Sequence, residues 1–380
     1  MSRSRFFCVP KAVGRGAGLA NELIPWAKAC LAAHAIDGHC LHPAWGMNPR
    51  RYWRHFGTSR LDFAAYRLLE LIYPVVITFD ERAYRANYDP DFSQAFANWV
   101  LSLRLPRFVP VVFLLEGMWG GLGALDRSRP FLLSQLYRSA STLTNIMAKM
   151  PAAGRSRRVR VGIHYRSGDF KGTFCPGDGQ GRWNRRLPLS WYIEICCELK
   201  AALDPEFVLV TDAPRTECEL IMDAVQPITT FDQDMTDVSD LLLLSQCDCI
   251  VPSLSSFSLA AIWLGSAAYI WPGEHAVELS SFLTLWGDEE QARDEKCGET
   301  ARNIRTVRAE PEMARYSRAF VRYTGRPLSA EFLEMLRQRS LFAQSCTDLI
   351  RYGVLPTCPD DYVLQDGEPE IAELVSREES

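Results

Sequence analysis

Short, unbroken apolar runs recur along this 380-residue chain and alternate with segments long enough to form helices. The runs with the length of a strand are Phe6 to Pro10, Val75 to Phe79, Val109 to Leu115, Val159 to His164, Phe207 to Thr211, Cys249 to Pro252 and Ala267 to Trp271. Runs of this kind are typical of strands that helices cover on both faces. The alternation of strand and helix therefore predicts an α/β fold with parallel sheets.

The length of the chain favours two domains, because a single hydrophobic core stops growing at roughly 250–300 residues. Residues 131–150 are expected to form a long helix, and the loop that follows it, AAGRSRRVR, is the predicted boundary. We therefore expect an N-terminal domain at residues 1–154 and a C-terminal domain at residues 155–310. Residues 311–380 are expected to form a helical extension that ends in an acidic tail.

The composition excludes several classes of protein. The chain is 47% hydrophobic and 23% charged, and its 42 Lys and Arg against 46 Asp and Glu give a formal net charge of −4. This balance is globular, and it lacks the basic field that wholesale nucleic-acid binding requires. The 12 cysteines are too sparse for a disulfide scaffold. The amino terminus lacks the apolar segment of a secretory signal, so we expect a cytoplasmic protein.

Three glycines lie between the first predicted strand and a helix that begins near Ala20. Gly14, Gly16 and Gly18 allow the backbone to approach a ligand closely, and the helix amino terminus presents free N–H groups to an anion. The dinucleotide-binding pattern requires a further glycine where Leu19 stands. By itself the motif fits a tight turn as well as an anion site.

Polar residues follow two of the predicted strands in the second half. His164, Arg166 and Asp169 come directly after VRVGI, and Asp212 follows the next strand. Ligands of open α/β sheets bind at the carboxyl ends of strands, and a guanidinium can donate two hydrogen bonds to a phosphate. A phosphate-bearing group that leaves a sugar carbon needs such a charge when no metal serves. The structural alternative is an ion pair between Arg166 and Asp169 and a histidine that caps the strand end.

A serine-rich segment follows a third strand. Asp240 lies in the first turn of a predicted helix, and the segment CDCIVPSLSSFS (residues 247–258) is expected to form a strand, a loop and the start of the next helix. Its hydroxyls and the N–H groups of the helix start can converge on a pyrophosphate. Serines in this place are ordinarily helix caps, so both roles stay open.

These segments carry a resemblance to a known family. HYRSGD, then TDA, then SDLLLLSQCDCIVPSLSSFSLAAIWLG, in that order and spacing, resemble the donor domain of the GDP-fucose-dependent fucosyltransferases, closest to the α-1,2 type. AGLANELIPWA resembles the glycine turn and first helix of the same family. The resemblance implies a GT-B fold, in which two Rossmann-like domains face each other across a cleft and the second binds most of the donor.

The resemblance also implies a reaction and roles for individual residues. Arg166 matches the arginine that binds the pyrophosphate, and Asp169 matches the end of the same catalytic motif. Other positions match donor-binding residues of the family: His164, Asp212, Asp240, Ser255, Ser256, Ser258, Gly18 and Asn21. The implied reaction is an inverting transfer of fucose from GDP-fucose to a hydroxyl of a glycan or lipid-linked glycan acceptor. It uses no metal and no cofactor.

The sequence departs from the family at one charged position. The family motif has a second arginine where Ser167 stands, so one positive charge on the leaving group is missing. Three arginines are candidates to supply it: Arg182, Arg185 and Arg186. Three carboxylates are candidates for the base that accepts the acceptor proton: Asp169, Glu22 and Asp178.

Two other functions stay open. A metal-dependent transferase would use Asp232-Gln233-Asp234 as a D-x-D site, because two neighbouring carboxylates can share a divalent cation. A noncatalytic glycan-binding or nucleotide-binding protein would keep the fold without turnover, and Ser167 favours this alternative. The basic cluster at residues 155–160 is too short for a nucleic-acid surface and is a candidate for peripheral contact with an anionic membrane.

Overall fold

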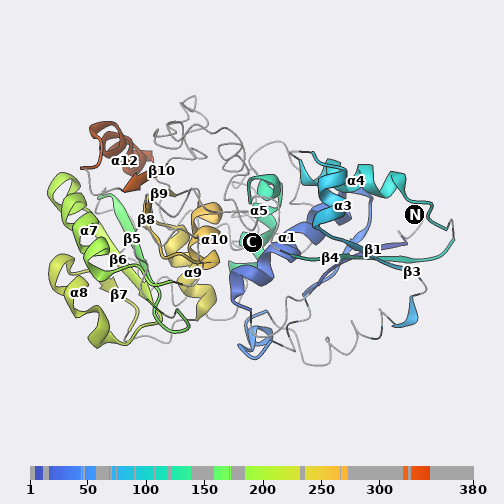
Figure 1. Ribbon diagram of the computed structural model, residues 1–380, viewed down its shortest axis with the longest axis horizontal. Helices are drawn as coiled ribbons and strands as arrows, with labels where there is room; N and C mark the ends of the chain where they lie inside the picture. Colours follow the sequence, from blue (N-terminus) through green and yellow to red (C-terminus); the bar gives the residue numbers. More distant parts are fainter. Residues whose placement is uncertain are drawn as a thin grey trace, which may run out of the picture. The chain divides into compact units, whose positions relative to one another are not determined.

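Figure 1 shows a computed structural model of the chain. The structure describes residues 5–11, 17–43, 45, 48–56, 68, 71–73, 75–89, 91–106, 108–117, 122–137, 158–170, 172, 185–231, 236–265, 267–272, 320–323 and 327–342. These residues divide into two compact units, unit 1 up to Tyr137 and unit 2 from Arg158 onwards. The predicted domain boundary after residue 154 lies outside the described residues and stays a prediction.

Unit 1 is built on a four-stranded parallel sheet with the order β2-β1-β4-β3. The strands are β1 (Phe6–Pro10), β2 (His39–Cys40), β3 (Val75–Phe79) and β4 (Val111–Leu115). Every residue of β4 is buried, as expected for a central strand with an unbroken apolar sequence. The carboxyl end of β1 leads through the glycine-rich segment to the first helix.

Helix α1 is the centre of unit 1. It packs on β1, β2 and β4 and also against α4 and α5. Almost all of its side chains are buried, and Trp26 makes edge-to-face ring contacts with Trp45 and Phe131. The helices of unit 1 include α1 (Leu19–Ala35), α3 (Glu81–Ala86), α4 (Phe92–Ser102) and α5 (Arg129–Tyr137), with the short 3-10 helices η2 (Tyr52–Arg54) and η3 (Leu122–Ser128).

Unit 2 contains a six-stranded parallel sheet with the order β10-β9-β8-β5-β6-β7. The strands are β5 (Arg160–Tyr165), β6 (Glu206–Thr211), β7 (Ile228–Thr229), β8 (Cys249–Val251), β9 (Ala268–Pro272) and β10 (Phe320–Tyr323). Counted along the chain within this unit, the spatial order is 3-2-1-4-5-6, which is that of the Rossmann fold.

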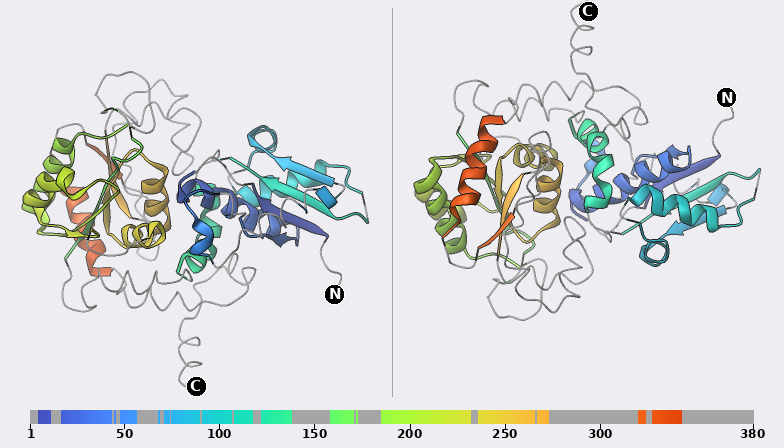
Figure 2. Two further views of the ribbon diagram at one scale, coloured as in Figure 1. Left: turned by 90° about the horizontal axis from the view of Figure 1, so that it is seen from below. Right: turned by 90° about the horizontal axis from the view of Figure 1, so that it is seen from above.

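Helices cover both faces of the unit 2 sheet (Figures 1 and 2). On one face lie α7 (Leu189–Leu203), α8 (Glu219–Val225) and α12 (Ala330–Phe342), and on the other lie α9 (Asp237–Ser245) and α10 (Ser256–Gly265). A Cβ atom on Gly265 would lie 1.7 Å from the carbonyl oxygen of Ser245, so a glycine is required where α9 and α10 meet. No helix within the described residues has the length and apolar sequence needed to cross a membrane.

The α/β class is confirmed, with parallel sheets in two Rossmann-like units. Each predicted apolar run contains a strand. The segment at residues 311–380, expected to be helical, contains helix α12, but the expectation is wrong for Phe320–Tyr323, which form strand β10 beside β9. This run has four residues and includes the charged Arg322, so its sequence alone does not predict a strand. The strand is recognised from its pairing with β9. Of the long helix predicted at residues 131–150, the structure describes the part up to Tyr137 as α5.

Candidate functional site

The crevice expected to bind a ligand in unit 2 lies between β5 and β8. These neighbouring strands pair with Ile163 opposite Val251. From β5 the chain continues to β6 on one side of this pair, and from β8 it continues to β9 on the other side. In sheets of this order, ligands bind outside the carboxyl ends of the two strands at which the strand order reverses. Strand β5 leads directly into the loop at residues 166–170, called here the Arg166 loop, and β8 leads into the serine segment. The fold therefore brings two of the predicted motifs to one place.

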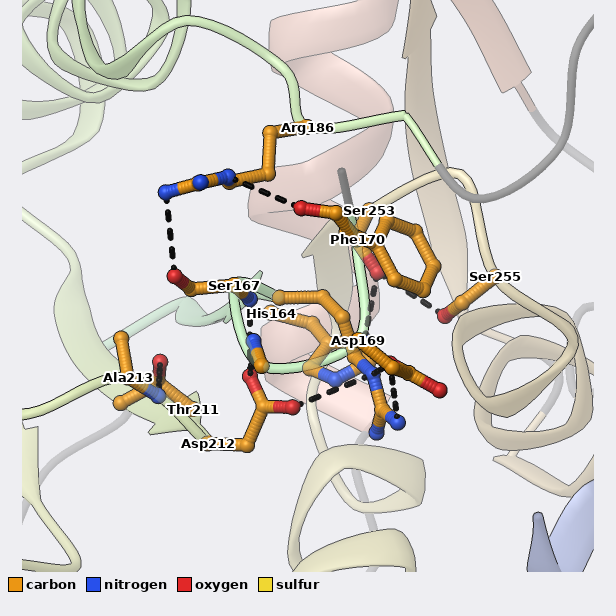
Figure 3. A network of polar contacts seen from close by, with 12 residues as sticks. His164, Ser167, Asp169, Phe170, Arg186, Thr211, Asp212, Ala213, Ser253 and Ser255 are labelled. Atoms are coloured by element: carbon orange, nitrogen blue, oxygen red, sulfur yellow. Dashed lines mark hydrogen bonds and ion pairs between the residues drawn. The ribbon is translucent and has the colours of Figure 1, made fainter. Parts of the chain in front are cut away.

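His164 joins these two motifs (Figure 3). Its side chain projects from β5 and is 3% exposed. The ring atom Nδ1 lies 2.6 Å from Oγ of Ser258 and 3.1 Å from Oγ of Ser253. The ring also packs against that of Phe257, with 5.0 Å between the centroids. The structure thus joins the histidine and the serine segment, which the sequence indicates only as separate motifs, through Ser253 as well as Ser258.

His164 is held in its neutral form. Burial, together with the smaller effect of the positive charge of Arg166, lowers its pKa to about 3. A neutral imidazole has one donor and one acceptor nitrogen, so it can order the hydroxyls around it without adding charge. A ring with such a low pKa is also a weak proton acceptor, so it is a poor general base.

The serine segment both caps α10 and forms a hydroxyl cluster. Oγ of Ser255 accepts a hydrogen bond from the Ser258 amide at 3.2 Å, which is the geometry of a helix cap. The Ser253 amide donates to Oγ of Ser258 at 3.0 Å, and the hydroxyls of Ser253 and Ser255 are 2.9 Å apart. All three side chains are buried. The capping role is therefore present, while the contact of these hydroxyls with a pyrophosphate stays a prediction.

Arg166 lies at the carboxyl end of β5 between two carboxylates. Its Nη2 donates to Oδ1 of Asp169 at 2.8 Å, and its Nε lies 3.2 Å from Oδ2 of Asp212. The guanidinium also lies over the ring of Phe170, with 5.6 Å to the centroid. The Asp169 side chain is 58% exposed and that of Asp212 is 33% exposed. The structure therefore brings Arg166, Asp169 and Asp212 together.

The carboxylate of Asp212 organises the backbone of the Arg166 loop. Its Oδ1 accepts hydrogen bonds from the amides of Ser167 at 2.8 Å and Gly168 at 3.3 Å. A Cβ atom on Gly168 would lie 2.6 Å from Oδ2 of Asp212, so only a glycine permits this approach without a shift. The predicted contact of Asp212 with the donor stays a prediction, while its contact with the loop is direct.

Two further predicted donor residues come from the helices of the same unit. Ser256 is the first residue of α10, beside the serine cluster. Asp240 lies in the first turn of α9, where its amide donates to the carbonyl of Thr236 at 2.9 Å. Helices α9 and α10 pack together on one face of the sheet, so Asp240 and the start of α10 lie on that same face. Their contact with a donor stays a prediction.

Gly18, Asn21 and Glu22 belong to unit 1. The carbonyl of Gly18, which precedes α1, accepts hydrogen bonds from the amides of Asn21 and Glu22. Glu22 is 3% exposed, and its Oε1 accepts a hydrogen bond from Nδ2 of Asn48 at 3.0 Å. Oδ1 of Asn21 is buried and has no hydrogen-bond partner among the residues that the structure describes. The contact of Gly18 and Asn21 with a donor therefore stays a prediction.

Several candidates lie outside the described residues, namely Gly14, Gly16, Asp178, Arg182 and Asp232-Gln233-Asp234. The metal alternative at the D-x-D motif is therefore not tested by the structure. Within the described ranges, no group of three or more His, Cys, Asp or Glu side chains is placed to hold a metal ion.

Sequence reasoning missed three residues of the site. Ser253 lies within the serine segment, and its place between β8 and α10 could have suggested it. Tyr165 and Glu217 carry no comparable signal. Oη of Tyr165 donates to Oε1 of Glu217 at 2.7 Å, and Oγ of Ser167 lies 2.8 Å from each oxygen of the same carboxylate. Of the arginines considered as replacements for a missing charge, Arg186 lies at Ser167.

Comparison with known proteins gives a limited likeness. No model of a protein family matches the sequence, and no curated protein matches it. Among solved structures, POFUT1 in complex with GDP-fucose matches with a TM-score of 0.44 and 10% identity over 70% of this chain and 96% of that chain. POFUT1 in complex with GDP matches with a TM-score of 0.40 and 11% identity over 69% of this chain and 94% of that chain.

Proposed function

We propose that the protein is an inverting, metal-independent glycosyltransferase that moves fucose from GDP-fucose to a hydroxyl of a glycan acceptor. The observation that carries this proposal is the position of Arg166 at the point where the strand order of a Rossmann-type sheet reverses. The start of α10 lies at the same edge, so a guanidinium and a helix amino terminus both favour an anion there. The resemblance of the surrounding motifs to fucosyltransferases supports the choice of donor.

In this proposal Arg166 binds the diphosphate of the donor. Asp169 is the exposed partner of the guanidinium, whereas Asp212 is anchored by two backbone amides. The incoming phosphate therefore replaces Asp169 and leaves Asp212 in place. A well-placed cationic donor on the departing phosphate stabilises the transition state by about 3 to 4 kcal/mol.

Inversion requires a base for the proton of the acceptor hydroxyl, and we assign this role to Asp169. While it is paired with Arg166, the carboxylate is occupied by the guanidinium. Displacement by the donor phosphate would free it for the acceptor. Glu22 is the less suitable candidate, because its carboxylate already binds Asn48 in the interior of unit 1.

The test is the release of GDP from GDP-fucose in the presence of EDTA, with GDP-mannose as the control donor. We expect fucose-selective release that survives chelation and that falls about a hundredfold to a thousandfold in the Arg166→Ala variant. Release that stops with EDTA would move the charge-stabilising role to Asp232 and Asp234 and overturn the metal-independent mechanism.

A noncatalytic binding protein is the second candidate. The observation in its favour is that two carboxylates already neutralise Arg166 while Ser167 occupies the position of a second arginine. Such a protein would bind GDP-fucose saturably and release no GDP in the presence of any glycan acceptor. Calorimetric binding and GDP release, measured on the same sample, separate it from the transferase.

A further inference from the structure

Arg186 holds the Arg166 loop through its side chain and its backbone (Figure 3). Its Nε donates to the carbonyl of Phe170 at 3.1 Å, and its Nη1 donates to Oγ of Ser167 at 3.2 Å. Its amide donates to the carbonyl of Gly172 at 3.1 Å. One residue from the segment before α7 thus contacts both ends of the loop.

Glu217 holds the same loop through the Ser167 hydroxyl. It comes from the short 3-10 helix η4 (Arg215–Cys218), which follows β6. Its carboxylate accepts hydrogen bonds from Oη of Tyr165 and from Oγ of Ser167, and Nη1 of Arg186 donates to its Oε1 at 2.7 Å. Tyr165 and Ser167 are buried, whereas the side chains of Arg186 and Glu217 are partly exposed, at 37% and 27%.

The ionisation states of this group keep the contacts intact near neutral pH. Burial and the interactions with Glu217, partly offset by Arg186, raise the pKa of Tyr165 to about 12, so the hydroxyl stays a donor. Burial also raises the pKa of Glu217, but the hydrogen bonds from Tyr165 and Ser167 and the charge of Arg186 outweigh this effect. The pKa of Glu217 is therefore below its ordinary value, and the carboxylate is charged.

We infer that Arg186 and Glu217 are positioning residues that together fix the Arg166 loop and thereby aim Arg166 at the donor phosphate. This inference rests on the proposed function. Asp212 holds the Ser167 amide while Glu217 and Arg186 hold the Ser167 hydroxyl, so the residue next to Arg166 is fixed from two directions. The planar guanidinium suits this role, because its Nε and Nη1 donate to different acceptors in fixed directions.

The geometry favours positioning by Arg186 over direct contact with the donor. Nε and Nη1 of Arg186 are both engaged with acceptors of the protein, and the carboxylate of Glu217 neutralises its charge. If Arg186 acted instead as a second cation on the phosphate, removal of Glu217 would strengthen it. The two roles therefore predict opposite effects of the Glu217→Gln substitution.

The experiment measures GDP release and GDP-fucose binding for Arg186→Met, Arg186→Lys, Glu217→Gln and the double variant Arg186→Met/Glu217→Gln. We expect each single variant to lower kcat by about tenfold to a hundredfold, while the Kd of the donor changes less. The reason is that a displaced Arg166 weakens binding of the transition state more than binding of the donor. The double variant should be no slower than the slower single variant, since both residues act through one loop. Lysine should not restore the rate, because it lacks the planar fork.

A matched control lies at the opposite end of the same two strands. Nε of Arg160 lies 2.7 Å from Oε2 of Glu206, at the amino ends of β5 and β6. Arg160→Met removes an ion pair whose side chains are also partly exposed, at 19% and 22%, and we expect kcat and donor Kd to stay at wild-type values. An equal loss in this control would show a general effect on the sheet and overturn the positioning role.

Hydrogen exchange separates failure of this inference from failure of the proposed function. The amides of Ser167, Gly168 and Phe170 are hydrogen-bonded within the site, so they exchange slowly in the wild type. In Arg186→Met and Glu217→Gln we expect these amides to exchange at least about tenfold faster, with exchange in β5 unchanged. This readout needs no donor, so it tests the loop even if GDP-fucose is not the substrate. Unchanged exchange, or a kcat that rises in Glu217→Gln, overturns the inference.

Discussion

The Asp212 carboxylate forms an ion pair with Arg166 across the ends of two neighbouring strands, with 3.2 Å between Oδ2 and Nε. Oδ1 of the same carboxylate binds the amides of Ser167 and Gly168. One side chain therefore fixes both the backbone of the loop and the position of the Arg166 guanidinium. Because two backbone amides bind the Asp212 carboxylate, a donor phosphate is not expected to displace it. Asp212 therefore acts as a fixed support, and Asp169 is the partner that can exchange.

We predict that substitutions of Asp212 lower turnover in proportion to the contacts they remove. Asp212→Asn keeps an oxygen acceptor for the Ser167 amide but loses the charge that holds Arg166, and kcat should fall about tenfold. Asp212→Ala loses both contacts and should fall about a hundredfold, since hydrogen bonds to charged groups contribute about 1.5–3 kcal/mol each. Initial rates of GDP release measure both. Asp223→Asn, an exposed change on α8, is the control and should leave the rate unchanged.

Asp169→Asn should separate donor binding from catalysis. Removing the exposed negative charge leaves Arg166 with less competition, so the donor should bind up to about fivefold more tightly, the range expected for a surface ion pair. If Asp169 is the base, kcat should fall about a hundredfold or more at the same time. Calorimetry with GDP-fucose and single-turnover rates give the two values. A variant with unchanged kcat would exclude Asp169 as the base.

The neutral His164 predicts a pH dependence of stability. Its pKa is about 3 in the folded chain and close to its ordinary value of 6.5 when unfolded, so the unfolded chain binds an extra proton between these values. The stabilisation is complete above about pH 6.5 and declines as the pH falls. Between about pH 7.5 and pH 5.5 the loss is about 1.4 kcal/mol.

The measurement is urea unfolding of the wild type and of His164→Asn across this pH range. Because the other titrating groups are common to both proteins, the difference between their unfolding free energies should shrink by about 1.4 kcal/mol towards pH 5.5. Parallel curves would mean that the ring takes up its proton as readily in the folded chain as in the unfolded chain, contrary to its burial.

The strand ends that carry the site are predictable from the sequence, because a strand covered on both faces is a local apolar run. The runs at residues 159–164 and 207–211 correspond to β5 and β6, and their pairing places His164, Arg166 and Asp212 at one edge. The general rule for parallel sheets then identifies this edge as the place for a ligand.

The contacts that organise the site are not predictable in the same way, because they join segments far apart in the chain. Ser167 and Glu217 are 50 positions apart, and a single acid after a strand has no local pattern that marks it. The sequence predicts Asp212 as a donor ligand but does not reveal its contact with the Ser167 amide. A carboxylate at a strand end has the same local sequence pattern whether it binds a ligand or a loop amide. Strand β10 escapes prediction for a related reason, because its short mixed run is defined by pairing with β9.

We predict that alanine substitutions of Ser258 and Ser255 lower the unfolding free energy by different amounts. Ser258→Ala removes a fully buried hydroxyl that binds the Ser253 amide and the His164 ring, so it should lower the unfolding free energy by about 1–3 kcal/mol. Ser255→Ala removes a helix cap and should cost about 1 kcal/mol. Denaturant midpoints at pH 7.5 measure both changes. A larger loss for Ser255→Ala than for Ser258→Ala would contradict the central place of Ser258 in the cluster.

Gly168→Ala tests how closely the loop and Asp212 must approach. The new methyl group would lie 2.6 Å from Oδ2 of Asp212, so the carboxylate has to move away from Arg166 and from the two amides it holds. We expect kcat to fall about tenfold, the effect of weakening one charged hydrogen bond, while the melting temperature changes little because the loop lies outside the core. GDP release and thermal unfolding measure the two effects.

The Asp212→Ala background supplies the control for this substitution. Without the carboxylate nothing opposes the added methyl group, so combining Gly168→Ala with Asp212→Ala should not slow the enzyme further. Substitutions that act through one contact are non-additive in this way, whereas independent substitutions multiply their effects on the rate. If the double variant is instead slower than Asp212→Ala by the full factor seen for Gly168→Ala alone, the glycine is required for another reason, such as direct approach of the donor to the loop backbone.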